Sequence, residues 1–545
     1  MSQPAICEEH PNDPSPRPIF VDTHCHTFNG ADLPVEGFIK RSVLGLHGGV
    51  VERLVAPLVR LIAKLADVSK TAAEEEEQID AMLAAGIDPM ALPTPAQPAG
   101  LAALEAALEA SPSDDPLGAE PDDGAFAQHL EAMITDLAAS EDPADRELYA
   151  ALAREVADGT ADEAAGGGAP AAEAFAGPVT PVVVAAGLLT VGGTLARYIR
   201  WARLMTRFRF KIIERLMRTY GERRGCVDLY TPAQVDLALW LDDHPITPQA
   251  TQVALMEKTI RLFRGRLHPL VAFDPWQESL EPGAVGGPLD RVRHAVEHQG
   301  FVGVKVYPPM GFSAFQNEEY NYTLLPHIPD KPASKVFGKG LDDALRALYT
   351  WCEQKKVPVM AHAEATLGSQ PSWELRAHPN FWRLALKEFP GLRINLAHFG
   401  GTENLIDWGQ HNGWTQAIGR LMEEDDGNVY SDFGHFSEID NANHRREIFD
   451  GLAHFFDVYP TAAKRVMFGT DWVLLAKERG AERYFQVFAD ELSQRFSSAV
   501  TADILGGNAV RFFGLGQGRE NRKRLEVFWA QHNIQPPEWT RRIQP

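Results

Sequence analysis

Two histidines near the N-terminus, His24 and His26 in VDTHCH, are the first residues whose spacing could do chemistry. In a β-strand, residues i and i+2 point to the same face, so both imidazoles can bind one ion. Such a pair alone is a weak signal, but His362 in VPVMAHAE, His398 in INLAHFGG and Asp471 in VMFGTDW follow later in the chain. Imidazole nitrogens and a carboxylate suit Zn²⁺ or a similar ion and leave a position for water.

These candidates end short apolar runs that recur along the chain. The runs begin at Pro18, Val235, Leu267, Phe301, Val357, Ile394, Val429 and Val466, and most successive starts lie roughly 30–37 residues apart, the span of one strand and one crossover helix. They are near-continuously apolar, which is typical of parallel strands buried on both faces. Helical patterns from Gly340 and Ala481 fall between them. The pattern predicts an α/β fold, a (β/α)₈ TIM barrel, in which active sites form at the carboxyl ends of the strands.

The remaining sequence predicts a large insertion after the first strand. We expect a barrel from residues 18–30 and 222–515, a mainly helical, partly low-complexity insertion over 31–221, and a C-terminal extension over 516–545 that wraps the barrel. Within the insertion, residues 35–85 read as amphipathic helix, and residues 91–180 hold 27 Ala and 18 acidic residues, a low-complexity composition. The insertion could cover the substrate pocket as a lid or bind a partner.

An uncharged run over Gly177–Ala196 and a basic amphipathic pattern from Arg197 end the insertion. The run is long enough to span a bilayer, but one crossing there would place parts of the same barrel on opposite sides of the membrane. The basic pattern is compatible with an anionic membrane surface or with packing inside the protein. We favour packing and keep the membrane surface as the alternative.

Charge and cysteine usage narrow the partners and the compartment. The net charge of -22 excludes broad nucleic-acid binding, which needs basic surface. Cys7, Cys25, Cys226 and Cys352 form no CxxC pair and no disulfide-like framework, and no signal-peptide pattern is visible at the N-terminus. We therefore expect a cytoplasmic homo-oligomer in a reducing compartment, with peripheral membrane association as the alternative and a small molecule as substrate.

VDTHCH, the two single histidines, GTDW and ILGGNAVRFFGL together resemble the amidohydrolase superfamily. The sequence is most similar to the branch of aminocarboxymuconate-semialdehyde decarboxylase and related hydrolases, over residues 18–30 and about 222–515. The resemblance implies that His24, His26, His362 and Asp471 are metal ligands. It also implies that His398 is a catalytic histidine near the metal.

Lys305, Tyr307 and Glu364 are further candidates at the ends of predicted strands. Some relatives carry a carboxylated lysine that bridges two metals, but Lys305 could equally pair with a substrate carboxylate or an internal acid. Tyr307 and Glu364 are assigned no mechanism. We expect one divalent metal, Zn²⁺ rather than Mn²⁺ or Fe²⁺, and no second metal.

The preferred function is metal-dependent hydrolysis of an amide, lactone or ester. Asp471 would take a proton from a metal-activated water, and Asp471 or His398 would protonate the leaving group. The alternatives are metal-dependent non-oxidative decarboxylation and a barrel scaffold or membrane-surface protein that acts through its insertion. The substrate does not follow from the sequence, because many chemistries share this fold.

Overall fold

The computed structural model describes residues 5–7, 17–35, 69–91, 124–165, 180–188, 194–223, 225–322, 334–366, 368–408, 413–425 and 427–543. In this part of the chain the strands are β1 (Val21–Cys25), β2 (Leu229–Pro232), β3 (Leu270–Ala272), β4 (Gly303–Val306), β5 (Val359–His362), β6 (Ile394–Ala397), β7 (Val429–Asp432) and β8 (Val466–Met467). Every residue of these strands is buried, as near-continuous apolar runs predict.

All strand pairs are parallel. Strands β3 to β8 form one sheet in chain order, and β1 pairs with β2. Isolated parallel bridges, including Ala233 with Leu270, join the β2 segment to the β3 segment. At the other side of β1, the Thr23 amide donates a 3.1 Å hydrogen bond to the Phe468 carbonyl, just after β8. The parallel α/β prediction is therefore confirmed.

The predicted position of the second strand, from Val235, is wrong. The strand is LYTP at residues 229–232, and Ala238–Leu241 forms helix α11 instead. The buried side chains Leu237, Trp240 and Leu241 stand at i, i+3 and i+4, which is the spacing of one helix face. The apolar run from Val235 therefore contains a helix, and the shorter run at residues 229–232 forms the strand.

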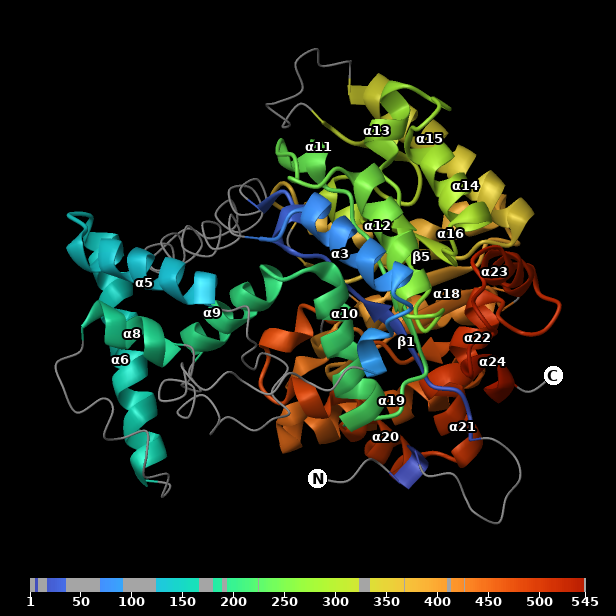
Figure 1. Cartoon of the computed structure of the whole chain (residues 1–545). Helices are drawn as coiled ribbons and strands as arrows, with labels where there is room; N and C mark the ends of the chain where they lie inside the picture. Colours follow the sequence, from blue (N-terminus) through green and yellow to red (C-terminus); the bar gives the residue numbers. More distant parts are fainter. Residues whose placement is uncertain are drawn as a thin grey trace.

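Helices alternate with the strands and surround them (Figure 1). Between β2 and β8, α11 is followed by α12 (Gln249–Leu262), α13 (Pro275–Leu280), α14 (Pro288–His298), α15 (Ser334–Lys355), α16 (Trp382–Glu388), α17 (Thr402–Ile406), α18 (Trp414–Glu424) and α19 (Ala442–Val458). After β8 come α20 (Tyr484–Arg495), α21 (Ser498–Ala502), α22 (Asn508–Phe513), α23 (Glu520–Gln531) and α24 (Trp539–Arg542). In the C-terminal extension, Leu525, Phe528, Trp529 and Trp539 are buried in the main hydrophobic core, so this segment is part of the packing and not only a surface strap.

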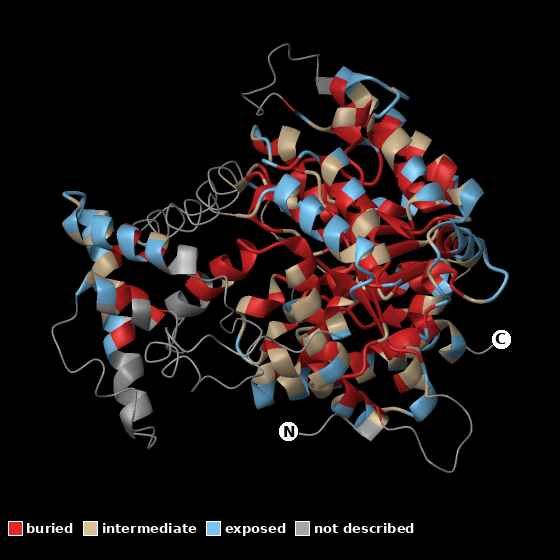
Figure 2. Cartoon of the chain, viewed as in Figure 1, coloured by how far each residue is buried: buried red, intermediate tan, exposed pale blue. Residues whose placement is uncertain are grey.

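The described part of the insertion is helical. It contains α3 (Ala72–Ala84), α5 (Gly124–Ala139), α6 (Pro143–Ala165), α8 (Pro181–Leu188), α9 (Thr194–Met205) and α10 (Arg209–Met217). Helices α5, α6 and α8 share a second hydrophobic core with Ile199 and Ala202 of α9, separate from the main one. Figure 2 shows buried residues both in this group and around the strands. The predictions over 36–68, 92–123, 166–179 and 189–193 lie outside the described residues.

The end of the insertion packs into the main core. Leu204, Phe208, Phe210 and Ile213 are buried among the residues of the strands and their helices. Four arginines of the basic pattern, Arg200, Arg203, Arg207 and Arg209, are buried as well. These four arginines therefore pack inside the protein. Within the described residues, no helix combines the length and apolarity that a membrane crossing requires.

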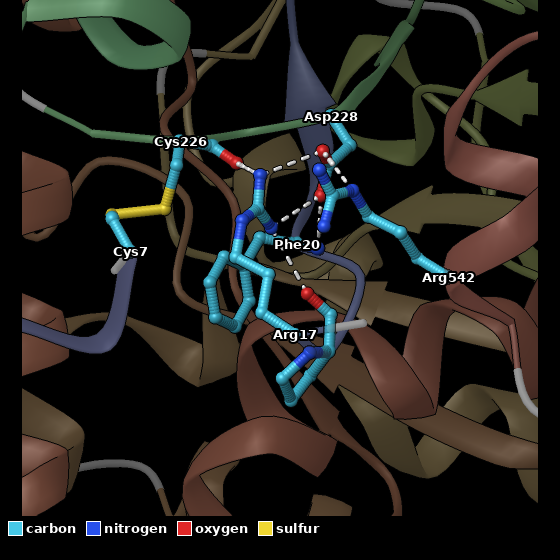
Figure 3. The surroundings of a disulfide bond; sticks show 7 residues. Cys7, Arg17, Phe20, Cys226, Asp228 and Arg542 are labelled. Carbon is cyan, nitrogen blue, oxygen red and sulfur yellow. Dashed lines mark hydrogen bonds and ion pairs between the residues drawn. A yellow bond between two sulfur atoms is a disulfide. The ribbon is translucent and has the colours of Figure 1, made fainter. Parts of the chain in front are cut away.

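A disulfide joins Cys7, in the 3₁₀-helix η1 (Ala5–Cys7), to Cys226, just before β2. Figure 3 shows the ion pairs beside it, in which Arg17 and Arg542 both contact the carboxylate of Asp228. The prediction that the cysteines form no disulfide is wrong. The cysteines therefore no longer support a reducing compartment. The partners are separated by 219 residues, so no local spacing pattern could reveal the pair. Cys25 and Cys352 are free and buried.

We expect the Cys7–Cys226 disulfide to stabilise the protein by about 2–5 kcal/mol, since a cross-link between distant residues restricts the unfolded chain. Reductant should lower the denaturant midpoint of the native protein. A Cys7→Ala/Cys226→Ala variant should start at the lower midpoint and not respond to reductant. Equal midpoints for the native protein with and without reductant would contradict this stabilisation.

Candidate metal centre

The five predicted site residues all lie at the carboxyl ends of strands and are buried. His24 and His26 are at the end of β1, His362 ends β5, His398 follows β6, and Asp471 follows β8. Because parallel strands end at the same edge, these side chains meet although the sequence separates them widely.

Asp471 is the centre of the cluster. Its Oδ1 lies 3.3 Å from Nε2 of His26 and 3.6 Å from Nε2 of His24. His24, His398 and Asp471 each offer a ligand atom within 4.8 Å of the others. The structure therefore brings together four of the five predicted residues around one carboxylate.

Three of the imidazoles are oriented by hydrogen bonds from Nδ1, which in His24 and His26 is the ring nitrogen on the side away from Asp471. Nδ1 of His26 lies 2.7 Å from the Ala233 carbonyl, and Nδ1 of His398 lies 3.1 Å from the Gly434 carbonyl. Nδ1 of His24 lies 3.0 Å from Oδ1 of Asp432. Carbonyls and ionised carboxylates only accept, so each Nδ1 carries the hydrogen. In the neutral rings, each Nε2 is then left with a lone pair.

This arrangement fits a divalent cation. Burial lowers the pKa of His26, and it lowers the pKa of His398 to about 3, so both rings are neutral near pH 7. Oδ1 of Asp471 is buried and accepts no hydrogen bond from the described residues. A carboxylate oxygen that faces imidazole lone pairs needs a cation between them.

His362 lies beside this cluster in a second group. His362, Glu364 and His398 have ligand atoms within 4.8 Å of one another, and the rings of His362 and His398 are 4.3 Å apart. Nε2 of His362 is 2.7 Å from the hydroxyl of Thr366, a residue that sequence reasoning missed. Of the predicted ligands, His24, His26 and Asp471 lie in the first group. His362 lies in the second group and is connected to the first by His398, which belongs to both.

Lys305 points into the same cluster from β4. Its Nζ lies 3.3 Å from Nε2 of His24, and burial lowers its pKa to about 8. Among the described residues, its Nζ forms no ion pair with a carboxylate, so the internal-acid partner considered above is not found. Tyr307 packs against His362, with ring centroids 4.6 Å apart and ring planes tilted by 39°. Burial raises the pKa of Glu364 to about 7, and its side chain is 31% exposed at the edge of the cluster.

Asp432, at the end of β7, is a site residue that sequence reasoning missed. This fully buried carboxylate accepts hydrogen bonds from the ring of His24, the side chain of Asn395 at 2.6 Å and the amide of His398 at 3.3 Å. It therefore fixes the orientation of His24. An acid within an otherwise apolar strand, in VYSDFGH, was the signal that could have revealed it.

The backbone is strained where the site side chains leave the strands. His398, His435 and Asp471 have φ values of 68°, 64° and 56°, the left-handed region that costs a non-glycine residue on the order of 1 kcal/mol or more. Such strain is common at functional sites and here redirects the side chains after the strand ends. Nδ1 of His435 lies 3.2 Å from Oδ2 of Asp471.

Other polar residues near the strand ends have structural partners. Asn29 caps the 3₁₀-helix η2 (Gly30–Asp32), and Asp274 caps α13. Asn508 donates hydrogen bonds to the carbonyls of Ala463 and Val466, and Cys25 is buried in the core. Cys25 therefore has a packing role, and Asn508 connects two backbone carbonyls.

A family model described as amidohydrolase matches residues 243–515, half of the chain, and the protein belongs to this family. The matched range includes His362, His398 and Asp471 but not β1. The predicted resemblance is confirmed, and membership of this family indicates an enzyme.

Comparison with solved structures finds amidohydrolases of low identity. An amidohydrolase from Burkholderia multivorans with bound HEPES is 14% identical, with a TM-score of 0.34; the match covers 53% of this chain and 84% of that one. The 5-carboxyvanillate decarboxylase of Novosphingobium aromaticivorans, complexed with manganese and 4-hydroxy-3-methoxy-5-nitrobenzoic acid, is 13% identical, with a TM-score of 0.34 and coverages of 53% and 77%. Comparison with curated proteins finds no match.

Proposed function

We propose that this protein is a metal-dependent hydrolase that acts on a C–N or C–O bond of a carbonyl-type group in a small molecule. The observation that carries the proposal is the buried Oδ1 of Asp471, which faces Nε2 of His26 and of His24 without accepting a hydrogen bond. Neutral imidazoles and one carboxylate are donors that Zn²⁺ prefers, with Mn²⁺ or Fe²⁺ as alternatives.

We further propose that the eight strands close into a (β/α)₈ barrel formed by residues 18–30 and 222–515. The hydrogen bond from Thr23 to Phe468 and the bridge between Ala233 and Leu270 support closure, because they continue the pairing on both sides of the β1–β2 pair. A closed ring would place the ends of β1 and β8 beside each other, and their side chains would hold the metal together.

The proposed ligands are His24, His26, His362 and Asp471, and Asp432 orients His24. A divalent ion bound there would act as a Lewis acid and lower the pKa of water. Asp471 would accept the proton of the attacking water. His398 bonds Gly434 through Nδ1, so its Nε2 carries a lone pair. This Nε2 would accept the proton that Asp471 takes from the water and then donate it to the leaving group. Lys305 would bind an anionic group of the substrate.

Metal analysis of the purified protein tests the first part of this proposal. We expect about one Zn²⁺ per chain, retained in a Lys305→Ala variant, because the lysine is not a ligand. Two ions per chain that fall to one in Lys305→Ala would contradict a single-metal site. Absence of any divalent ion, together with failure to bind added Zn²⁺, would overturn the metal centre itself.

A screen of amides, lactones and aromatic carboxylates in ¹⁸O-labelled water tests the reaction. Hydrolysis should place the label in the product acid. Release of carbon dioxide without label in the organic product would instead select decarboxylation, the alternative for the same donor set. Turnover of none of these substrates by the metal-loaded protein would favour a scaffold.

A further inference from the structure

Helix α9 of the insertion belongs to both hydrophobic cores. Ile199 and Ala202 are buried in the second core with α5, α6 and α8, whereas Leu204 and Met205 are buried in the main core. Figure 1 shows α9 running from the group of α5, α6 and α8 towards α10 beside the strands. This helix therefore connects the insertion to the body of the protein.

Trp201, on the same helix, contacts the loop that carries Asp471. Its indole packs against the main core, and its Nε1 donates a 2.8 Å hydrogen bond to the carbonyl of Val473. Val473 is two residues beyond Asp471. Because both groups of this bond are partly buried, it is protected from competing water and fixes the position of the loop backbone.

The corner between α9 and α10 also contacts the loop after β1. The side chain of Asn29 donates a 3.2 Å hydrogen bond to the Arg207 carbonyl. Arg209 binds both carboxylate oxygens of Asp32 at 2.7 and 3.0 Å, a two-point contact that restricts orientation. The same part of the insertion thus contacts the loop after β1 and the loop after β8, which respectively follow His26 and carry Asp471.

The two loops are bonded to each other at the site. The amide of Asp471 donates a 2.6 Å hydrogen bond to the His24 carbonyl, and the amide of His26 donates to the Trp472 carbonyl. A shift of one loop would therefore move donors from both β1 and β8. The hydrogen bond from Trp201 to Val473 connects these two loops to the insertion.

We propose that Trp201 is a positioning residue of the metal centre, which holds the Asp471 loop in place through the Val473 carbonyl and makes α9 part of the support of the site. This inference rests on the proposed metal centre. Groups that orient metal ligands without touching the metal typically change its affinity 10- to 100-fold. Trp201 acts through the backbone and not on the ligand itself, so we expect a smaller effect, about 3- to 10-fold.

The test is a titration of the full-length, metal-free protein with Co²⁺, followed by visible absorption, which reports the geometry of the ligands. Trp201→Phe keeps an aromatic ring and removes the indole N–H. We expect this variant to bind Co²⁺ about 3- to 10-fold more weakly and with an altered absorption spectrum. If Trp201→Phe fails to fold, 3-benzothienylalanine at position 201 retains the fused ring and removes only the donor.

Trp539→Phe is the matched control. This variant also removes an indole N–H that is bonded to a backbone carbonyl, that of Gly265 at 2.9 Å. Gly265 precedes the amino end of β3, whereas the metal site lies at the carboxyl ends of the strands. This variant should lose stability and keep the native Co²⁺ affinity. Native affinity and spectrum in folded Trp201→Phe would overturn the positioning role, as would an equal loss of affinity in Trp539→Phe. Failure of the native protein to bind Co²⁺ would overturn the proposed metal centre instead.

Discussion

Asp471→Asn is expected to lose the bound divalent ion and to lower kcat/KM by about 10³-fold or more. The substitution keeps the shape of the side chain but removes the negative charge that faces His24 and His26. It also removes the proposed proton acceptor, so metal binding and proton transfer fail together. Elemental analysis and steady-state kinetics on the substrate found by the screen measure the two losses.

Asp457→Asn controls for the change of charge. Asp457 is exposed on the last turn of α19, before the amino end of β8, and the same substitution there should leave metal content and kinetics unchanged. Native metal content in Asp471→Asn would show that Asp471 is not a ligand. Loss of metal with unchanged turnover would show that the ion takes no part in the reaction.

Deletion of residues 35–217 is expected to prevent folding rather than to leave an open, active barrel. The deletion removes apolar side chains buried in the main core: Leu204, Met205, Phe208, Phe210, Ile212, Ile213, Leu216 and Met217. Burial of each such side chain contributes about 1.5–3 kcal/mol. Their sum, about 12–24 kcal/mol, is comparable to or larger than the roughly 5–15 kcal/mol by which a typical domain is stable. Circular dichroism and cooperative thermal unfolding measure the outcome.

A shorter deletion, of residues 124–188, is the matched comparison. It removes α5, α6 and α8 and with them most of the second core, but it keeps α9, α10 and the bond from Trp201 to Val473. This variant should fold, bind Co²⁺ and expose Ile199 and Ala202. Cooperative unfolding of the variant without residues 35–217 would refute the assignment of α10 to the main core.

The structure changes the interpretation of the insertion. Among the described residues of the insertion, those of α5, α6 and α8 share a core with Ile199 and Ala202 of α9, whereas α10 packs in the main core. Arg200, Arg203, Arg207 and Arg209 are buried, so these four arginines do not belong to an exposed basic face of the kind that binds a membrane surface. A lid remains compatible with the position of the insertion after β1.

Local pattern was sufficient for most strands and for the chemistry of their ends. Strands buried on both faces leave near-continuous apolar runs, and seven of the eight predicted runs contain the observed strands. The run from Val235 failed because periodicity over so short a segment does not separate a strand from one helical turn. His24, His26, His362, His398 and Asp471 could be selected because each ends such a run.

What the sequence by itself determined is the set of donor residues and the parallel α/β order that carries them to one edge, since both follow from side-chain type and spacing. Only the tertiary structure decided which imidazole nitrogen faces Asp471, that Asp432 orients His24, that Cys7 pairs with Cys226, and that α9 holds the Asp471 loop. These are contacts between residues hundreds of positions apart. They depend on distance and direction in space, which no local pattern of residues encodes.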